Sequence, residues 1–546
     1  MVSSVSKAGP AVTEHGDASL TRRDVLSRTA LGILAAAGAP SLARAAGPSR
    51  QLTWAIHVSL APAWFDPADT LGFITPFMVL YALHDGMVKP MPGGPETACL
   101  AQSWQTSEDG LTHDFTIRDG VRFHDGEPVT AEDVKFSFER YRGAAHELMK
   151  KQVATVEAPD PRHVRFRMKA PWPDFLTFYS SASGAGWIVP KKYVEKVGDD
   201  GFKKAPIGAG PYKFVSFTPG VELVLEAFDG YWRKKPSVER LVMKVIPDDS
   251  TRLAALKRGE VDIAYSIRGE LAQELLKTPG LKLNAAVSQA PFYIDFPDQW
   301  DEKSPWHDLR VRQAANLALD RDGMNQALFL GHCKTTNSII PYTFEYYWQP
   351  PPAVYDPEKA KKLMAEAGYA GGFDAGLYYV DGSYANVAEI AINNLAAVGI
   401  RLKLQPVERA AFFAGYSAKN YRGGVIQSGS GAFGNAATRL ASFIVKDGAF
   451  VYGSYPDIDA LFPQQAVELN PKQRAAILTR MQQLVYEKAI NAPIWQLGFL
   501  NGTGPRVDHS AFGDIAGFAY TAPFEDITIK GACAANLAAA QYRKSV

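Results

Sequence analysis

The stretch QAPFYIDFPDQWDEKSPWHDLRVRQAANLALDR, residues 289–321, decides how the rest of the chain is organised. It starts with an apolar run, passes through a loop rich in Pro and Asp, and ends in a predicted helix that Asp308 can cap. The apolar positions of this helix recur at helical spacing, at Val311, Ala314, Ala315 and Ala318. Its arginines are expected to face solvent: Arg310, Arg312 and Arg321. Such a segment is typical of a chain that crosses between two lobes, so a second lobe is predicted to begin here.

Length and composition exclude several classes of protein. The chain has 546 residues, 47% of them hydrophobic and 21% charged, which is ordinary for globular protein. Five of the 58 Lys and Arg and three of the 57 Asp and Glu lie in residues 1–45, so the remainder has a net charge of −1. A charge so close to neutral gives no reason to expect binding to nucleic acid or to an anionic membrane surface.

The N-terminus has the pattern of an export signal. Arg22 and Arg23 precede a short apolar run over residues 30–39, and small residues follow at Ala43 and Ala45. This resembles a twin-arginine signal peptide that is cut after about Ala45. The alternative is a membrane anchor, but the apolar run is shorter than the roughly 20 residues that span a bilayer. We therefore expect a periplasmic protein.

Five motifs occur in sequence order after residue 50. They are FHDGEPVTAEDVKFSFERY (123–141), GAGPYKF (208–214), LKRGEVDIA (256–264), DLRVRQAANLALDRDGM (308–324) and YDPEKAKKLMAEAGY (355–369). In this order and spacing they resemble the family 5 extracellular solute-binding proteins of ABC importers, which bind dipeptides, oligopeptides, glutathione or nickel. The resemblance implies an α/β fold of the large two-lobed periplasmic binding protein type (type II, cluster C-like), with mixed sheets and a hinge between the lobes.

The resemblance and the local patterns together predict how the chain is divided. Residues 1–45 are the signal peptide, and 46–290 form lobe I with an inserted subdomain at about 78–200. Lobe II is expected at 297–492, and 493–546 return to lobe I. Within lobe II, helix and strand patterns alternate, which is typical of an α/β unit. Two crossings between lobes predict a cleft in which a small ligand binds.

A search for catalytic and metal-binding motifs favours binding over catalysis. The mature chain contains no G-x-S-x-G, phosphate-loop or H-E-x-x-H motif. Gly429, Gly431 and Gly434 fit G-x-G-x-x-G, but a single match deep in lobe II is weak evidence for a dinucleotide. The three cysteines, Cys99, Cys333 and Cys533, allow at most one disulfide and have no metal-ligand spacing. We predict no cofactor, no metal and no enzymatic activity.

The segment 421–446 carries the strongest information about the ligand. In peptide-binding members of the resembled family, a loop here supplies an acid that holds the peptide's α-ammonium group. This segment has no Asp or Glu, although it contains Arg439. A buried ammonium without an acid is strongly disfavoured. Asn435 is instead predicted to cap a helix after a Gly/Ser loop, an arrangement that favours anions. The alternative is a flexible turn with a solvated Arg.

The candidate ligand-binding residues follow from the resemblance and from this segment. They are Trp64, Phe65, Trp187, Tyr293, Arg409, Ser428, Gly429, Ser430, Arg439 and Trp495. Aromatic side chains hold ligands at little entropic cost. Core packing is the alternative for each aromatic residue, and surface exposure is the alternative for Arg409.

The predicted function is that of a monomeric substrate-binding subunit of an ABC importer. It would capture a small solute by hinge closure and deliver it to permease and ATPase subunits at the inner membrane. An opine-like compound, a modified amino acid or a sugar derivative is favoured. An ordinary peptide remains open, with its amine held by Asp295, Asp298 or Glu408. A periplasmic hydrolase and a chaperone-like receptor on the same scaffold are the alternative functions.

Overall fold

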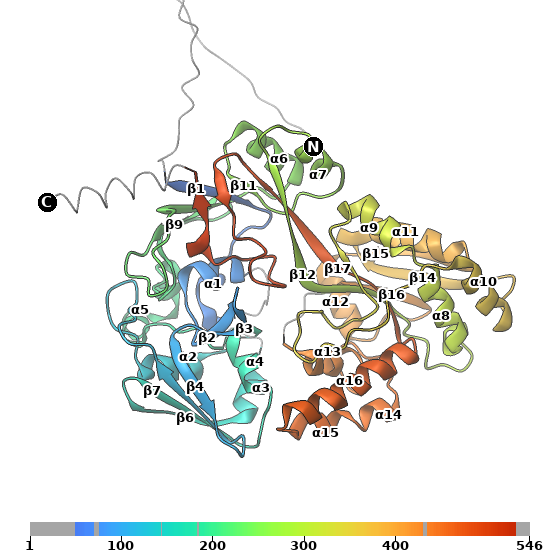
Figure 1. Cartoon of the computed structure of the whole chain (residues 1–546), viewed down its shortest axis with the longest axis horizontal. Coiled ribbons are helices and arrows are strands. Elements are labelled where there is room, and N and C mark those ends of the chain that lie inside the picture. The colour runs from blue at the N-terminus through green and yellow to red at the C-terminus, as the bar shows by residue number, and fades with distance from the viewer. Residues whose placement is uncertain (1–49, 70–75, 144, 183–184, 430–433, 531–546) are drawn as a thin grey trace, which may run out of the picture. The chain divides into compact units, whose positions relative to one another are not determined.

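The computed structural model describes residues 50–530, apart from 70–75, 144, 183–184 and 430–433 (Figure 1). Within them, an eleven-stranded sheet has the order β15-β14-β16-β12-β17-β11-β1-β10-β9-β8, with β13 also paired to β17. Its strands are β1 Gln51–Ile56, β8 Tyr212–Thr218, β9 Glu222–Ala227, β10 Arg240–Val245, β11 Ile263–Ala264, β12 Lys282–Asp295, β13 Lys334–Thr335, β14 Phe373–Asp381, β15 Ile400–Val407, β16 Gly424–Gly429 and β17 Asn491–Thr503.

Strands β12 and β17 join the two halves of this sheet. They are antiparallel over almost their whole length, and their register shifts between Val287 and Pro291. At one end of the pair, β17 also pairs with β11, and at the other end β12 also pairs with β16. We call the elements around β1 and β8–β11 lobe I, and those around β14–β16 lobe II. Parallel pairs occur in both lobes, β1 with β10 and β14 with β15. The predicted two-lobed fold with mixed sheets is confirmed.

Lobe I carries a second sheet of four antiparallel strands, ordered β4-β5-β7-β6. These are β4 Ala101–Thr106, β5 Thr112–Ile117, β6 Val153–Asp160 and β7 His163–Met168. Helix α2 (Ala131–Arg140) begins with a capping box between Thr130 and Asp133. The sheet and its helices have their own apolar core, which includes Phe115, Phe166 and Phe175. They lie within the predicted insert at about 78–200, whose boundaries stay a prediction, as do those of the lobes.

Helices cover both faces of the sheet in lobe II. Helices α8 (Leu309–Ala318), α9 (Arg321–Phe329), α10 (Pro357–Glu366) and α11 (Ala385–Ala396) share one core with Val425. The neighbouring Ile426 packs with α12 (Arg409–Ser417). Since consecutive residues of a strand point to opposite faces, these two groups of helices lie on opposite sides of β16. Helices α13 (Ala436–Phe443) and α16 (Pro471–Glu487) share a third core with Tyr293 of β12.

The remaining elements are shorter or lie at the edges of the lobes. They are α1 Phe77–Leu83, β2 Val88–Met91, β3 Gly94–Ala98, α3 His146–Gln152, α4 Phe175–Thr177, α5 Lys191–Lys204, α6 Asp249–Arg258, α7 Gly269–Leu276, α14 Pro456–Asp459, α15 Phe462–Val467, β18 Val507–His509 and β19 Thr528–Ile529. Cys99 and Cys333 are buried and carry free thiols. Cys533 and the predicted signal peptide lie outside the described residues.

Two arginines that were expected in solvent are buried. Arg312 is 3% exposed and Arg321 is 4% exposed, whereas Arg310 is exposed as expected. Arg312 donates to the carbonyls of Trp306 (2.6 Å) and Lys488 (2.9 Å). Arg321 donates to Pro493 O (2.7 Å) from its Nε. The prediction was wrong because a long Arg side chain can reach back across a helix to backbone carbonyls that need donors.

We predict that Arg321→Leu lowers the free energy of unfolding by about 3 kcal/mol or more. The change leaves the buried carbonyl of Pro493 and the part-buried carbonyl of Asn316 without their donor, and a buried orphaned group costs about 1–3 kcal/mol. Urea unfolding followed by circular dichroism measures the loss. Arg310→Leu on α8 is the matched control, because the exposed Arg310–Asp308 pair should contribute about 1 kcal/mol or less. Equal losses in the two variants would contradict the prediction.

Candidate functional site

Aromatic rings from both lobes surround the region where β12 and β17 pass between them. Tyr265, directly after β11, packs on Trp54 of β1 and Phe499 of β17, each with ring centroids 5.8 Å away. Tyr520 lies 4.6 Å from Phe499. On the lobe II side, Tyr384 packs edge-on against Phe292, with centroids 4.7 Å apart. We call these six residues the aromatic cluster.

Two arginines lie beside the aromatic cluster. Burial raises the pKa of Tyr384, and the positive charges of Arg409 and Arg268 act on its hydroxyl in the opposite sense. Arg268 also contributes, after burial and Arg252, to lowering the pKa of His57 to about 4. The His57 ring packs at a tilt against the Tyr265 ring, with centroids 5.0 Å apart. The two guanidinium groups, one from each lobe, are therefore close to the same group of rings.

The two arginines differ in their partners. Arg409 Nη1 lies 2.5 Å from Asp381 Oδ2, and its side chain is half exposed. Arg268 is exposed at the start of α7, and no ion pair joins it to a carboxylate in the part of the chain that the structure describes. Arg409 was predicted from the sequence, and Arg268 was not. The motif LKRGEVDIA stops four residues before Arg268, so a search limited to motifs misses it.

Several buried polar atoms near the crossing have no hydrogen-bond partner among the described residues. They are Trp54 Nε1, His57 Nδ1, Tyr265 Oη, Trp495 Nε1, Thr521 Oγ1 and both amide atoms of Gln496. Most buried polar groups in proteins are paired, because an orphaned one costs about 1–3 kcal/mol. Most of these atoms are neutral hydrogen-bond donors, and they are buried in this structure.

The predicted aromatic residues of the first part of lobe I lie in its core. Trp187 is 2% exposed and packs on Tyr81 with ring centroids 5.3 Å apart. Phe65 is 1% exposed and packs edge-on against Phe217 at 5.0 Å. Trp64 is half-buried against the same core. For Phe65 and Trp187 the packing favours the core alternative, and their role in ligand binding stays a prediction.

The predicted residues of lobe II form a buried group under α13. Tyr293 pairs with Ser428 across β12 and β16, and the guanidinium of Arg439 lies 5.5 Å from the Tyr293 ring. Arg439 is 3% exposed and donates to Ile339 O (3.1 Å). The solvated-Arg alternative is therefore wrong for Arg439, whose pKa is lowered by burial. Whether Arg439 contacts a ligand stays a prediction.

The other predicted positions are placed as follows. A Cβ on Gly429 would lie 2.4 Å from the Phe292 ring, so a side chain there would displace part of the aromatic cluster. Trp495 is fully buried and packs edge-on against Phe329 at 5.6 Å. Asn435 caps α13 as predicted, through a capping box with Thr438. Ser430 lies outside the described residues.

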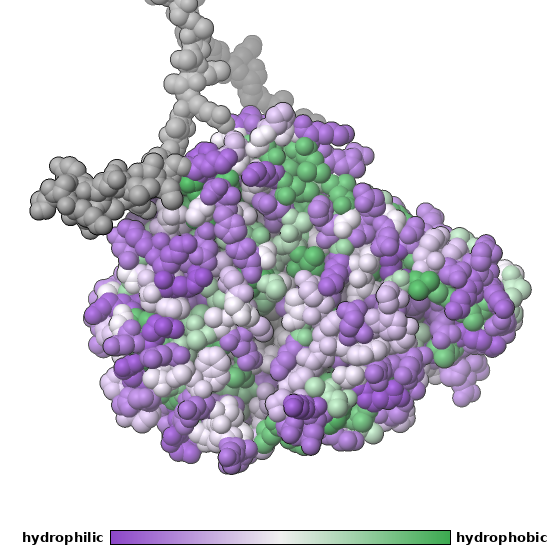
Figure 2. All heavy atoms as spheres, viewed as in Figure 1, coloured by the Kyte–Doolittle hydropathy of each residue, from purple (hydrophilic) through white to green (hydrophobic). Residues whose placement is uncertain are grey.

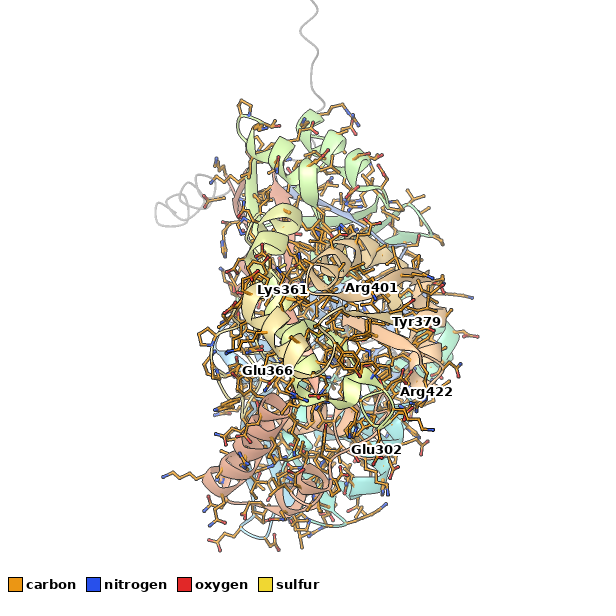
Figure 3. All side chains as sticks on the ribbon, turned by 90° about the vertical axis from the view of Figure 1, so that its right-hand side faces the viewer. Glu302, Lys361, Glu366, Tyr379, Arg401 and Arg422 are labelled. Carbon is orange, nitrogen blue, oxygen red and sulfur yellow. The ribbon has the colours of Figure 1, made fainter. Side chains whose placement is uncertain are left out.

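The acids proposed for a peptide amine are engaged within lobe II. Asp295 is 8% exposed and accepts hydrogen bonds from Tyr416 Oη (2.9 Å) and Asn491 Nδ2 (3.3 Å). Asp298 accepts from Gly423 N (2.7 Å) and faces Arg422, which lies with Tyr379 and Arg401 on the outer side of lobe II (Figure 3). Glu408 accepts from Ala411 N (3.1 Å) in the first turn of α12.

A separate cavity of about 380 Å³ lies within lobe II. It is lined by residues of α8, α10 and α16, among them Asn316, Leu363 and Gln482, and by the edge of β17 at Pro493. The aromatic cluster does not line it. In the described part of the chain, no three His, Cys, Asp or Glu residues are placed to hold a metal ion. None of the helices described is both long enough and apolar enough to cross a membrane.

Comparison with known proteins gives the family. Residues 97–449, more than half of the chain, match the model for bacterial extracellular solute-binding proteins, family 5 middle. The chain belongs to this family of solute-binding proteins, and the resemblance seen in its motifs is confirmed.

Individual relatives agree with this assignment. The chain is 30% identical over 317 residues to the glutathione-binding protein GsiB of Salmonella typhi, a match that covers 57% of this chain and 60% of that protein. NikA from Brucella suis, solved with Fe(III)-EDTA, superposes with a TM-score of 0.76 over 88% of this chain and 100% of NikA at 24% identity. The periplasmic binding protein AgaA from A. tumefaciens R10, solved with agropinic acid, superposes with a TM-score of 0.67. The match covers 88% of this chain and 99% of AgaA at 25% identity. The relatives are binding proteins.

We predict a pH-dependent cost of the buried Asp295. Burial raises its pKa from 3.8 to about 6. Below pH 3.8 the carboxyl is protonated in both the folded and the unfolded chain, so its burial does not oppose ionisation. Between pH 3.8 and about 6 the unfolded chain ionises while the folded chain keeps its proton. The free energy of unfolding therefore falls as the pH rises through this range. Raising the pKa from 3.8 to about 6 corresponds to about 3 kcal/mol of stability.

Asp295→Asn removes this titration and keeps the shape of the side chain. The stability of the native protein relative to Asp295→Asn should fall by about 3 kcal/mol between pH 4 and pH 7.5, measured by urea unfolding at each pH. A constant difference across this range would contradict the assignment of a buried, neutral acid.

Proposed function

We propose that this protein is the substrate-binding subunit of an ABC importer and that it binds a small solute between its lobes without converting it. The proposal rests on one observation above all: rings and a guanidinium group from each lobe meet at the β12–β17 crossing. A strand pair that joins two lobes can act as a hinge, and closure around a ligand is common in such folds. Family membership supports the same role. Separately encoded permease and ATPase subunits would complete the transporter.

The solute that best fits this site carries an anionic group. Arg268 supplies positive charge without an ion pair to a carboxylate among the described residues, and Arg409 adds a second guanidinium that is paired with Asp381. Asp295 and Asp298 are engaged by partners of their own. The neutral donors beside the aromatic cluster suit hydroxyl groups on a flat or compact body. AgaA, a structural relative, was solved with an acid as its ligand. An opine-like compound, a modified amino acid or a sugar derivative with a carboxylate fits these features, and a peptide held by Asp295 is the alternative.

We predict that Arg268→Ala weakens binding of such a solute about 30-fold, or about 2 kcal/mol, because the anion loses a charged donor. A thermal-shift screen of opines, sugar acids and di- to pentapeptides would identify the solute, and calorimetry would measure its affinity. Arg401→Ala is the control, since Arg401 lies on the outer edge of lobe II (Figure 3). Thermal shifts confined to unmodified peptides, with affinity lost in Asp295→Asn instead, would favour the peptide alternative.

The alternative functions make different predictions. A hydrolase would convert the stabilising compound, so mass spectrometry after prolonged incubation should recover the solute unchanged if binding is the function. A chaperone-like receptor would present a broad apolar surface. On the face shown in Figure 2, hydrophobic residues lie in small patches between hydrophilic ones, which favours a small solute.

We also propose export to the periplasm by the twin-arginine route. Replacing Arg22 and Arg23 together with Lys should leave the precursor inside the cell, because the charge stays and only the arginine pair is lost. Fractionation of cells that express the native and altered chains would measure this. Normal periplasmic recovery of the altered chain would point to another route.

A further inference from the structure

A buried carboxylate of lobe I binds two side chains of lobe II. Asp174, the residue before α4, accepts hydrogen bonds at Oδ1 from Asn435 Nδ2 (2.6 Å) and from Arg474 Nη2 (2.7 Å). Exposure of the three residues is 8%, 0% and 1%. Asn435 begins α13, and Arg474 lies in the first turn of α16. In Figure 1, α4 faces α13 across the boundary between the lobes.

The two donors are held in place by lobe II itself. Arg474 donates to Gln465 Oε1 from Nη2 (3.0 Å) and Nε (3.2 Å), and its guanidinium lies 5.2 Å from the Tyr346 ring. Asn435 Oδ1 accepts from Thr438 N (3.2 Å) as the N-cap of α13. Both side chains therefore keep their orientation without Asp174. A preorganised pair of donors binds a carboxylate with little further loss of entropy.

The surroundings make this contact sensitive to the charge of Asp174. Burial, and then the negative charges of Glu345 in lobe II and of Asp174, raise the pKa of Glu96 on β3 to about 7. The contact is thus rich in acids, and general attraction between the surfaces does not explain it. The specific geometry of the two donors does. Breaking one partner of a buried pair is costly because the other charge loses its compensation.

We infer that Asp174 is a positioning residue for closure, which holds lobe I against α13 and α16 and so completes the site between the lobes. The inference deepens the proposed function and rests on its closure step. Asn435 lies within the acid-free segment 421–446 and is the N-cap of α13, so the contact also fixes the start of α13 relative to lobe I. Loss of this contact should shift the protein towards open conformations and weaken solute binding.

The test measures closure without a solute. The full mature chain is labelled at Lys192→Cys in α5 and Glu358→Cys in α10, whose native side chains are 86% and 81% exposed. Energy transfer between the labels and the radius of gyration from X-ray scattering are then measured for the labelled chain with native Asp174 and for the same chain with Asp174→Asn. We expect lower transfer and a larger radius in Asp174→Asn, with an open-to-closed ratio shifted about tenfold. Arg480→Gln, at an exposed pair on α16, should match the native chain.

A second variant distinguishes loss of the contact from misfolding of the chain. Asn435→Asp keeps a good N-cap for α13 but places a carboxylate against Asp174, so it should open the lobes at least as much as Asp174→Asn. Unchanged energy transfer and radius in both folded variants would overturn the inference. A lower unfolding stability with unchanged lobe separation would also overturn it, since that result describes a merely structural contact.

Failure of the closure role of Asp174 and failure of the proposed solute binding give different experimental results. If no compound stabilises the native chain, the proposed solute binding fails, but the opening caused by Asp174→Asn is still measured. If a solute is found and its affinity stays native in both variants, only the role of Asp174 in closure fails.

Discussion

The backbone ladder between β12 and β17 is the constraint on which the rest of the structure depends. All thirteen residues of β17 are buried, and its pairing with β12 continues from one lobe into the other. Buried backbone groups must be paired, so neither strand can leave this ladder without a large cost. The pairing brings Phe292 of β12 beside Trp495 of β17, and it brings Phe499 of β17 under Tyr265 and Tyr520. The proposed ligand site follows from this arrangement.

Buried arginines serve two purposes in this chain. Arg312 and Arg321 donate to backbone carbonyls around the start of β17, and so stabilise the return of the chain from lobe II. Arg474 meets a carboxylate of the opposite lobe. Near the aromatic cluster, Arg409 pairs with Asp381, and Arg268 has no ion pair with a carboxylate among the described residues. The fold, and not the residue type, therefore decides which partner each arginine has.

Local signals in the sequence predicted helix starts well. Asp308 and Asn435 cap the helices that they were expected to cap, because a capping side chain bonds to backbone only two or three residues away. The burial of Arg312 and Arg321 was missed, since their acceptors lie up to 177 residues away in sequence. Of the candidate site, Arg409 was found beside the aromatic cluster, whereas Tyr265, Arg268, Tyr384 and Tyr520 were not predicted.

By itself, the sequence determined the family, the two-lobed α/β class, the helix caps and the absence of an acid in residues 421–446. These properties depend on residue order and on contacts between near neighbours. Only the tertiary structure decided that Asp295 is buried beneath Tyr416, that Arg268 approaches Tyr384, and that Asp174 meets Arg474 over 300 positions of sequence. Such pairings follow from the packing of whole lobes, and no periodicity or spacing in the chain encodes which distant side chains the packing brings together.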